Sequence, residues 1–224
     1  MTVRDPVAEI ASHLSPEAHS ARLALFVSLG DSFTAGTGVA PGRAWPELLT
    51  SALQAHHPAI NLTNLAVEGA TSDEVAEQLP EAIELEPDLV TVVCGANDVL
   101  RHTRPDPMRY AANLALILGR LRLSVPGVRI ATATSPEQWD FLALGPRTRR
   151  RIEHGISDCN EVTRRLASAL DVPYLEVAGH PGLSHPENFS DDGLHPSAQG
   201  HERAAAGFAR LLHDRFRIET GATT

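Results

Sequence analysis

This 224-residue chain contains three side chains of the types used in nucleophilic catalysis: Ser32 near its start, and Asp192 and His195 near its end. A serine hydroxyl attacks well only when a base removes its proton, and imidazole titrates near neutral pH. That base needs a partner that fixes its tautomer and stabilises the imidazolium. Asp192 lies three residues before His195, so its carboxylate can reach the ring across one turn. These residues predict a serine nucleophile, provided that the fold brings Ser32 to His195.

Attack on an acyl group also needs donors for the negative charge that develops on the carbonyl oxygen. Gly69 offers a backbone N–H with no side chain to block approach, and Asn97 offers a side-chain amide. The backbone N–H of Ser32 would be the third donor. A simpler interpretation stands beside this one, because Asp31 and Ser32 are also typical caps of a helix that follows a strand. Gly69 and Asn97, taken singly, would suit turns.

The composition restricts the class of protein. The net charge is −9, and all 19 basic residues are arginine. This acidic balance argues against a general nucleic-acid binder, and the lack of lysine excludes a Walker A loop or a Schiff base. No apolar run approaches the roughly 20 residues of a membrane span, and the first 21 residues lack the apolar core of a signal peptide. Two cysteines give no disulfide framework. We therefore expect a cytoplasmic protein, unless a signal peptide has already been removed.

Strand-like and helix-like patterns alternate along the chain. Short apolar runs predict strands over 23–29, 60–67, 89–94, 128–133 and 172–177, and helical spacing predicts helices over 6–20, 44–55, 72–79, 107–123, 147–170 and 197–213. This alternation predicts a parallel sheet covered on both faces. We expect one domain over 23–214, a helical N-terminal extension over 1–22 and a polar tail over 215–224. Ser32, Gly69 and Asn97 follow successive strands and should meet at one edge of the sheet.

Four blocks in this order resemble the SGNH, or GDSL-like, hydrolase family. They are Gly30-Asp31-Ser32, the stretch 64–71 (NLAVEGAT), Gly95-Ala96-Asn97-Asp98 and the stretch 192–196 (DGLHP). The resemblance covers nearly the whole chain, although Phe33 stands where the eponymous leucine would be. It implies a flavodoxin-like three-layer α/β/α sandwich with a five-stranded parallel sheet. It also implies a serine esterase or lipase, with Ser32 as nucleophile, His195 as base and Asp192 as its partner, and an oxyanion hole formed by Ser32, Gly69 and Asn97.

The expected substrate is a small ester, with an acetyl or short acyl group, cleaved without a cofactor or metal. Phe33, Trp139 and Phe141 are predicted to line an acyl pocket under a cover formed by residues 134–147. Acyl transfer and the hydrolysis of a thioester or lysophospholipid are alternatives, because they would use the same acyl-enzyme. The resemblance favours a monomer with no nucleic-acid partner and no membrane span.

Two other classes of function compete with a serine hydrolase. Histidines and aspartates cluster near the C-terminus and could form the metal site of a hydrolase: His180, His185, Asp191, Asp192, His195 and His201. Their spacing matches no compact ligand motif, and a metal site would leave Ser32, Gly69 and Asn97 unexplained. A non-catalytic binding module with the same fold would need a broken site, whereas every element is present. Asp191 is a rival partner for His195, but the three-residue spacing favours Asp192.

Overall fold

The protein is described by a computed structural model over residues 23–221, so the helix predicted over 6–20 lies outside the described residues. One sheet of five parallel strands forms the middle layer, in the order β2-β1-β3-β4-β5. The strands are β1 (Leu25–Gly30), β2 (Asn61–Asn64), β3 (Leu89–Val93), β4 (Arg129–Ala133) and β5 (Tyr174–Leu175). This order is that of flavodoxin-like sheets, whose ligands bind beyond the carboxyl ends of the strands. The predicted fold class is therefore confirmed.

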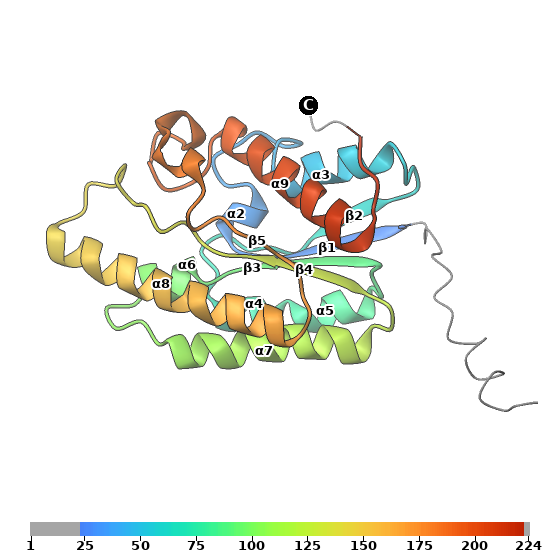
Figure 1. Ribbon diagram of the computed structural model, residues 1–224, viewed down its shortest axis with the longest axis horizontal. Helices are drawn as coiled ribbons and strands as arrows, with labels where there is room; N and C mark the ends of the chain where they lie inside the picture. Colours follow the sequence, from blue (N-terminus) through green and yellow to red (C-terminus); the bar gives the residue numbers. More distant parts are fainter. Residues whose placement is uncertain (1–22, 222–224) are drawn as a thin grey trace, which may run out of the picture.

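Helices cover both faces of the sheet (Figure 1). One face carries α3 (Trp45–Gln54) and α9 (Ala198–Phe216), and the other carries α4 (Ser72–Glu77), α5 (Leu79–Glu84), α7 (Pro107–Ser124) and α8 (Pro146–Ala169). Short turns of helix follow the strands: α2 (Ser32–Ala35), α6 (Ala96–Leu100), and the 3-10 turns η1 (Pro181–Ser184) and η2 (Pro186–Asn188). These short elements carry much of the candidate site.

The alternation of side chains along each strand divides the core in two. In β1, Val27 and Leu29 face the α7–α8 layer, whereas Phe26 faces the α3–α9 layer. The second layer is built on aromatic stacking, because the rings of Trp45 and Phe208 lie 4.4 Å apart. Burial on both faces explains why the central strands are apolar runs rather than alternating patterns.

Several elements differ from their predicted bounds. The strand predicted over 60–67 is β2, which ends at Asn64. The helix predicted over 72–79 is α4, which ends at Glu77, and a second helix, α5, starts at Leu79, because Pro80 lies in its first turn and supports a new helix start. The last strand, β5, has only 2 residues. Helix α9 continues to Phe216, and the tail then folds back so that Ile218 is buried and the Gly221 N–H donates to the Ala52 carbonyl.

None of the helices in the described part of the chain is both long and apolar enough to cross a membrane.

Candidate active site

Ser32 is the first residue of α2, directly beyond the end of β1. Asp31 caps this short helix, since its carboxylate accepts a hydrogen bond from the Phe33 N–H at 3.1 Å. The capping interpretation is therefore confirmed for Asp31, and the serine that follows it lines a pocket. Gly30 is needed for the sharp turn: a Cβ there would lie 2.5 Å from the Val93 carbonyl oxygen. The turn presents Ser32 at the carboxyl edge of the sheet.

A buried side chain that sequence reasoning missed holds the end of β1. Gln78, at the α4–α5 junction, accepts a hydrogen bond from the Gly30 N–H and donates one to the Gly30 carbonyl, both at 2.9 Å. The pairing of β1 with β2 ends at Ser28 and Asn64, before β1 itself ends. The Val67 N–H, beyond the end of β2, still donates to the Gly30 carbonyl, so the Gln78 amide supplies the acceptor for the Gly30 N–H that a longer β2 would have offered. No local pattern marks this role, because the contact joins residues 48 positions apart.

Two of the three donors predicted for the oxyanion hole, Gly69 and Asn97, lie on neighbouring segments. Gly69 has a φ of +75°, in the left-handed region that favours glycine. The Asn97 side chain of α6 donates to the Ala70 carbonyl at 3.0 Å, and Arg101, directly after α6, donates to the Gly69 carbonyl at 2.8 Å. Helix α6 and the residue that follows it therefore fix the glycine loop. Within residues 23–221, the backbone N–H groups of Ser32 and Gly69 donate no hydrogen bond.

His195 and Asp192 lie on a small hairpin in which Phe189 pairs with Pro196. His195 Nδ1 lies 2.6 Å from an Asp192 carboxylate oxygen. The other oxygen accepts hydrogen bonds from Ser190 Oγ and from the backbone N–H groups of Leu194 and His195, at 2.8–2.9 Å. Desolvation alone would raise the pKa of Asp192, but its hydrogen bonds with His195, Leu194 and Ser190 hold that pKa well below the usual range. Asp192 is therefore a fixed negative charge beside the imidazole.

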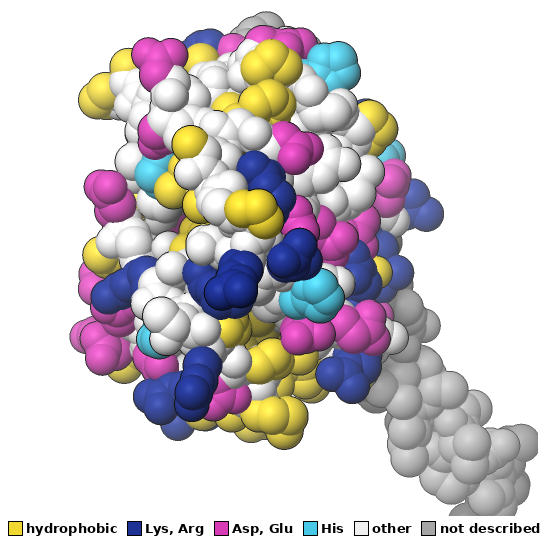
Figure 2. Space-filling view, turned by 90° about the vertical axis from the view of Figure 1, so that its left-hand side faces the viewer, with side chains coloured by type: hydrophobic (Ala, Val, Ile, Leu, Met, Phe, Trp, Pro, Cys, Tyr) yellow, Lys and Arg dark blue, Asp and Glu magenta, His cyan; other side chains and the backbone are white. Residues whose placement is uncertain are grey.

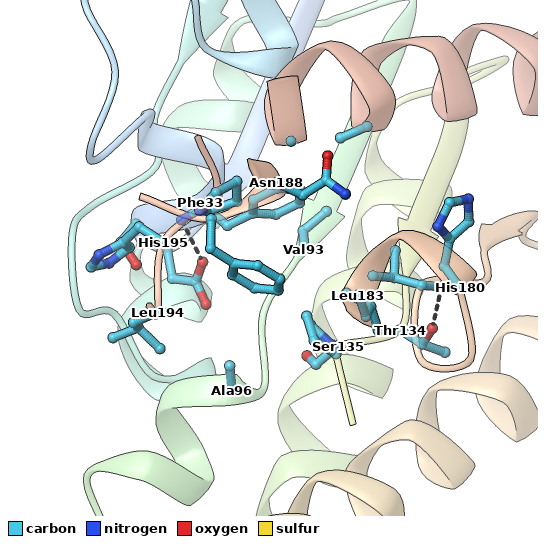
Figure 3. Close-up of a pocket in the computed structure, with 18 of the residues that line it drawn as sticks. Phe33, Val93, Ala96, Thr134, Ser135, His180, Leu183, Asn188, Leu194 and His195 are labelled. Atoms are coloured by element: carbon cyan, nitrogen blue, oxygen red, sulfur yellow. Dashed lines mark hydrogen bonds between the residues drawn. The ribbon is translucent and has the colours of Figure 1, made fainter. Parts of the chain in front are cut away.

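One pocket of about 380 Å³ contains the predicted chemistry, lined by Ser32, Gly69, Asn97 and His195. Among the described hydrogen bonds, none joins Ser32 Oγ to His195, although such contacts often tighten only when substrate binds. Figure 2 looks onto this end of the molecule, where basic side chains gather among hydrophobic ones. In Figure 3, His195 lies beside Phe33 at one side of the pocket.

The three predicted acyl-binding side chains divide into two groups. Phe33 and Trp139 line the pocket, but Phe141 does not. Phe141 instead packs on Phe189, with ring centroids 5.0 Å apart, and its backbone lies over Gly193. Arg149 of α8 holds this part of the 134–147 segment by donating to the carbonyls of Trp139 and Leu142 at 2.6 and 3.1 Å.

Two buried titratable groups lie behind the nucleophile. Burial raises the pKa of Asp31 to about 7, although the Phe33 N–H opposes the shift. Burial also lowers the pKa of His201 to about 4, helped by the nearby charge of His195. The His201 ring stacks on the Phe33 ring, with centroids 5.7 Å apart, and its Nδ1 accepts a hydrogen bond from the backbone N–H of Trp45. His201 is therefore a buried support for Phe33.

Of the histidines and aspartates that suggested a metal site, Asp192 and His195 lie in contact as a pair. In residues 23–221, no group of three or more His, Cys, Asp or Glu side chains is arranged to hold a metal ion.

Comparison with known proteins identifies relatives of this chain. Residues 28–203 match the GDSL-like lipase/acylhydrolase family. An arylesterase of Vibrio mimicus is 28% identical over 185 residues, which cover 82% of this chain and 86% of the relative. Thioesterase 1/protease 1/lysophospholipase L1 of Escherichia coli strain K12 is also 28% identical over 185 residues, covering 82% and 81%.

Solved structures support the same assignment of the fold. A lipase/acylhydrolase from Enterococcus faecalis superimposes with a TM-score of 0.69 at 23% identity, covering 86% of this chain and 97% of that one. Esterase EstA from Pseudoalteromonas sp. gives a TM-score of 0.66 at 19% identity, covering 85% and 97%. The family match includes the serine turn, the glycine loop, α6 and the hairpin of His195. The chain therefore belongs to the GDSL-like lipase/acylhydrolase family and is an ester hydrolase.

Proposed function

We propose that the enzyme cleaves carboxylic esters through an acyl-enzyme on Ser32. Ser32 Oγ attacks the carbonyl carbon while His195 Nε2 takes the hydroxyl proton and then gives it to the leaving alcohol. Water attacks the acyl-enzyme with the same imidazole as base, which releases the acid and restores Ser32. The observation that carries this proposal is the convergence of Ser32, Gly69, Asn97 and the Asp192–His195 pair on one pocket.

The negative charge of the tetrahedral intermediate would be held by the N–H groups of Ser32 and Gly69 and by the Asn97 amide. The fixed loop supports this role, because donors that are oriented before the reaction need no reorganisation as charge develops. One hydrogen of the Asn97 amide is used on the Ala70 carbonyl, which leaves the other for the substrate.

The pocket favours an acyl group longer than the acetyl or short chain expected from the sequence. It continues from Ser32 past Val93 of β3, Ser135 after β4 and Leu175 of β5. Neighbouring strands lie about 4.8 Å apart, so three strand spacings give about 14 Å. An extended alkyl chain advances about 1.3 Å per C–C bond, so about eleven bonds span that distance. The E. coli relative is named a thioesterase and lysophospholipase, so a thioester or lysophospholipid is the second candidate substrate.

The decisive test measures the release of p-nitrophenol from p-nitrophenyl esters, from acetate to palmitate. Ser32→Ala should lower kcat by 10⁴-fold or more, on the order of the loss when other serine hydrolases lose the nucleophile. Asp192→Asn should lower kcat on the order of 10²–10⁴-fold, because the imidazole loses its charged partner. Asp191→Asn is the matched control and should keep wild-type activity. Activity should be highest for chains of medium length.

Equal activity of the wild type and Ser32→Ala would overturn the nucleophile assignment. A folded wild type that hydrolyses none of the esters would favour a strict acyltransferase or a binding role. An equal loss in Asp191→Asn and Asp192→Asn would remove the basis for choosing Asp192 as the partner of His195.

A further inference from the structure

The pocket has an arm that the reaction itself does not need. It runs from Ser32 across the ends of β3, β4 and β5 and ends between α9 and the segment after β5. Figure 3 shows this extent: His195 and Phe33 lie at one side, and Leu183 and His180 lie at the other. Apolar side chains line much of the same arm: Leu175, Val177, Leu183 and Ala204.

The far end of the arm is basic, although the protein is acidic. Arg203 and Arg210 of α9 line it, and both are exposed. They are seven residues apart, which is two helical turns or about 10 Å along the axis. Neither forms an ion pair with any residue in the range 23–221. His180 lines the arm from the facing segment.

The acidic residue that lines the far end is already neutralised. Glu176 receives hydrogen bonds from Arg164 at 2.9 and 3.0 Å and from Thr134 Oγ1 at 2.7 Å. The Arg164 guanidinium beside it lowers the pKa of Glu176. Arg203 and Arg210 thus keep guanidinium donors available at the end of an apolar arm, and guanidinium groups bind carboxylates in bidentate geometry.

We propose that this arm selects an acyl chain whose far end carries a carboxylate, about eleven bonds from the ester carbonyl. The methylene chain would lie along the apolar wall, and the carboxylate would bind Arg203 and Arg210. This inference rests on the proposed function, because it takes Ser32 as the point where the acyl group is attached. It adds a substrate class: half-esters of medium-length dicarboxylic acids.

The test uses two chromogenic esters of the same twelve-carbon diacid. One is the mono-p-nitrophenyl ester with a free carboxylate, and the other has that carboxylate capped as a methyl ester. At low salt, wild-type kcat/KM should favour the free carboxylate by about threefold or more, within the range of exposed ion pairs. The preference should fall as NaCl is raised, since exposed charges are screened.

The double variant Arg203→Gln/Arg210→Gln should lose this preference and keep its activity on the capped ester. Arg120→Gln is the matched control, because it removes one exposed arginine charge from α7, on the opposite face of the sheet. Equal rates on both esters in the wild type, or a preference that survives in the double variant, would overturn the inference. Failure of the proposed function looks different, because Ser32→Ala would then remain as active as the wild type on both esters.

Discussion

Asp31 is a carboxylate that the fold buries beside the serine it precedes. Its side chain is 4% exposed, and burial raises its pKa from 3.8 to about 7. Between about pH 4 and pH 7, Asp31 is therefore protonated in the native state and ionised in the unfolded chain. Stability must fall as pH rises through this window, because the unfolded state binds fewer protons there. Above about pH 7 the native protein carries the full cost of a buried charge.

Asp31→Asn should remove that cost and keep the helix cap, since asparagine caps as well as aspartate. We expect a gain in the free energy of unfolding of up to about 4 kcal/mol at pH 8, because one pKa unit corresponds to about 1.36 kcal/mol. The gain should nearly vanish at pH 4. Denaturant unfolding at both pH values measures it, with the exposed Asp214→Asn as control. A gain of the same size at both pH values would contradict this account.

The residues that sequence reasoning predicted from their chemistry and short spacing come together in the structure. Ser32, Gly69, Asn97 and His195 all line one pocket, and Asp192 lies against His195 as its three-residue spacing predicted. Supports that act across long sequence distances were missed, as with Arg101, which reaches a carbonyl 32 positions away. For Phe141 the sequence predicted a role in the pocket that the structure does not give it. Its aromatic character suggested the pocket lining, but the ring packs on Phe189, a contact that depends on the path of two loops.

At the scale of elements, the junction of α4 and α5 supports the end of the strand that carries Ser32. Gln78 is 8% exposed and binds both polar backbone groups of Gly30. The Gly30 carbonyl has a second partner in the Val67 N–H, whereas Gln78 is the acceptor that the structure gives the Gly30 N–H. Removing the Gln78 amide would therefore leave a buried donor without a partner.

Gln78→Leu should destabilise the protein by about 1–3 kcal/mol, the cost of an unsatisfied buried polar group. It should also lower kcat roughly 10- to 100-fold with little change in KM, because small displacements of a reacting group are costly. Gln54→Leu is the control, since Gln54 donates to the Ile60 carbonyl at the far end of α3. If Gln78→Leu lost stability alone, with kcat unchanged, Gln78 would be structural and would not position Ser32.

The elements that local pattern predicts well are the long ones. Helices α3, α7 and α8 lie within a residue or so of their predicted bounds, because their apolar stripes repeat over several turns. Short elements such as β5 and η1 carry too little pattern of their own. Their conformation depends on tertiary contacts, for example the hydrogen bond from the Thr132 N–H to the Pro173 carbonyl beside β5.

At the scale of the whole molecule, the last described residues return to the α3–α9 layer. Ile218 is 5% exposed and belongs to the same core as Trp45 and Phe208. The Ile218 N–H donates to the Leu212 carbonyl, so the turn after α9 is also fixed by backbone. A tail that looked merely polar in sequence therefore contributes a buried side chain to the core.

Ile218→Ala should lower the free energy of unfolding by about 2–4 kcal/mol, the range for removing a large buried side chain. Glu219→Ala should change it by less than about 0.5 kcal/mol, because Glu219 is exposed and lies 3.6 Å from His213. Urea unfolding of both variants and the wild type measures the difference, and esterase activity should persist in each. Equal stability of the two variants would mean that the tail does not pack in solution as described.

The sheet is long at its centre and short at its borders. Strands β1, β3 and β4 have 6, 5 and 5 residues, whereas the edge strands β2 and β5 have 4 and 2. An edge strand exposes a row of unpaired backbone groups on which a second chain can add a strand, and short edges are one protection against such aggregation. A neighbouring copy would find a two-residue template at β5. The short edge strands of the sheet thus protect this enzyme from strand-by-strand association in concentrated solution.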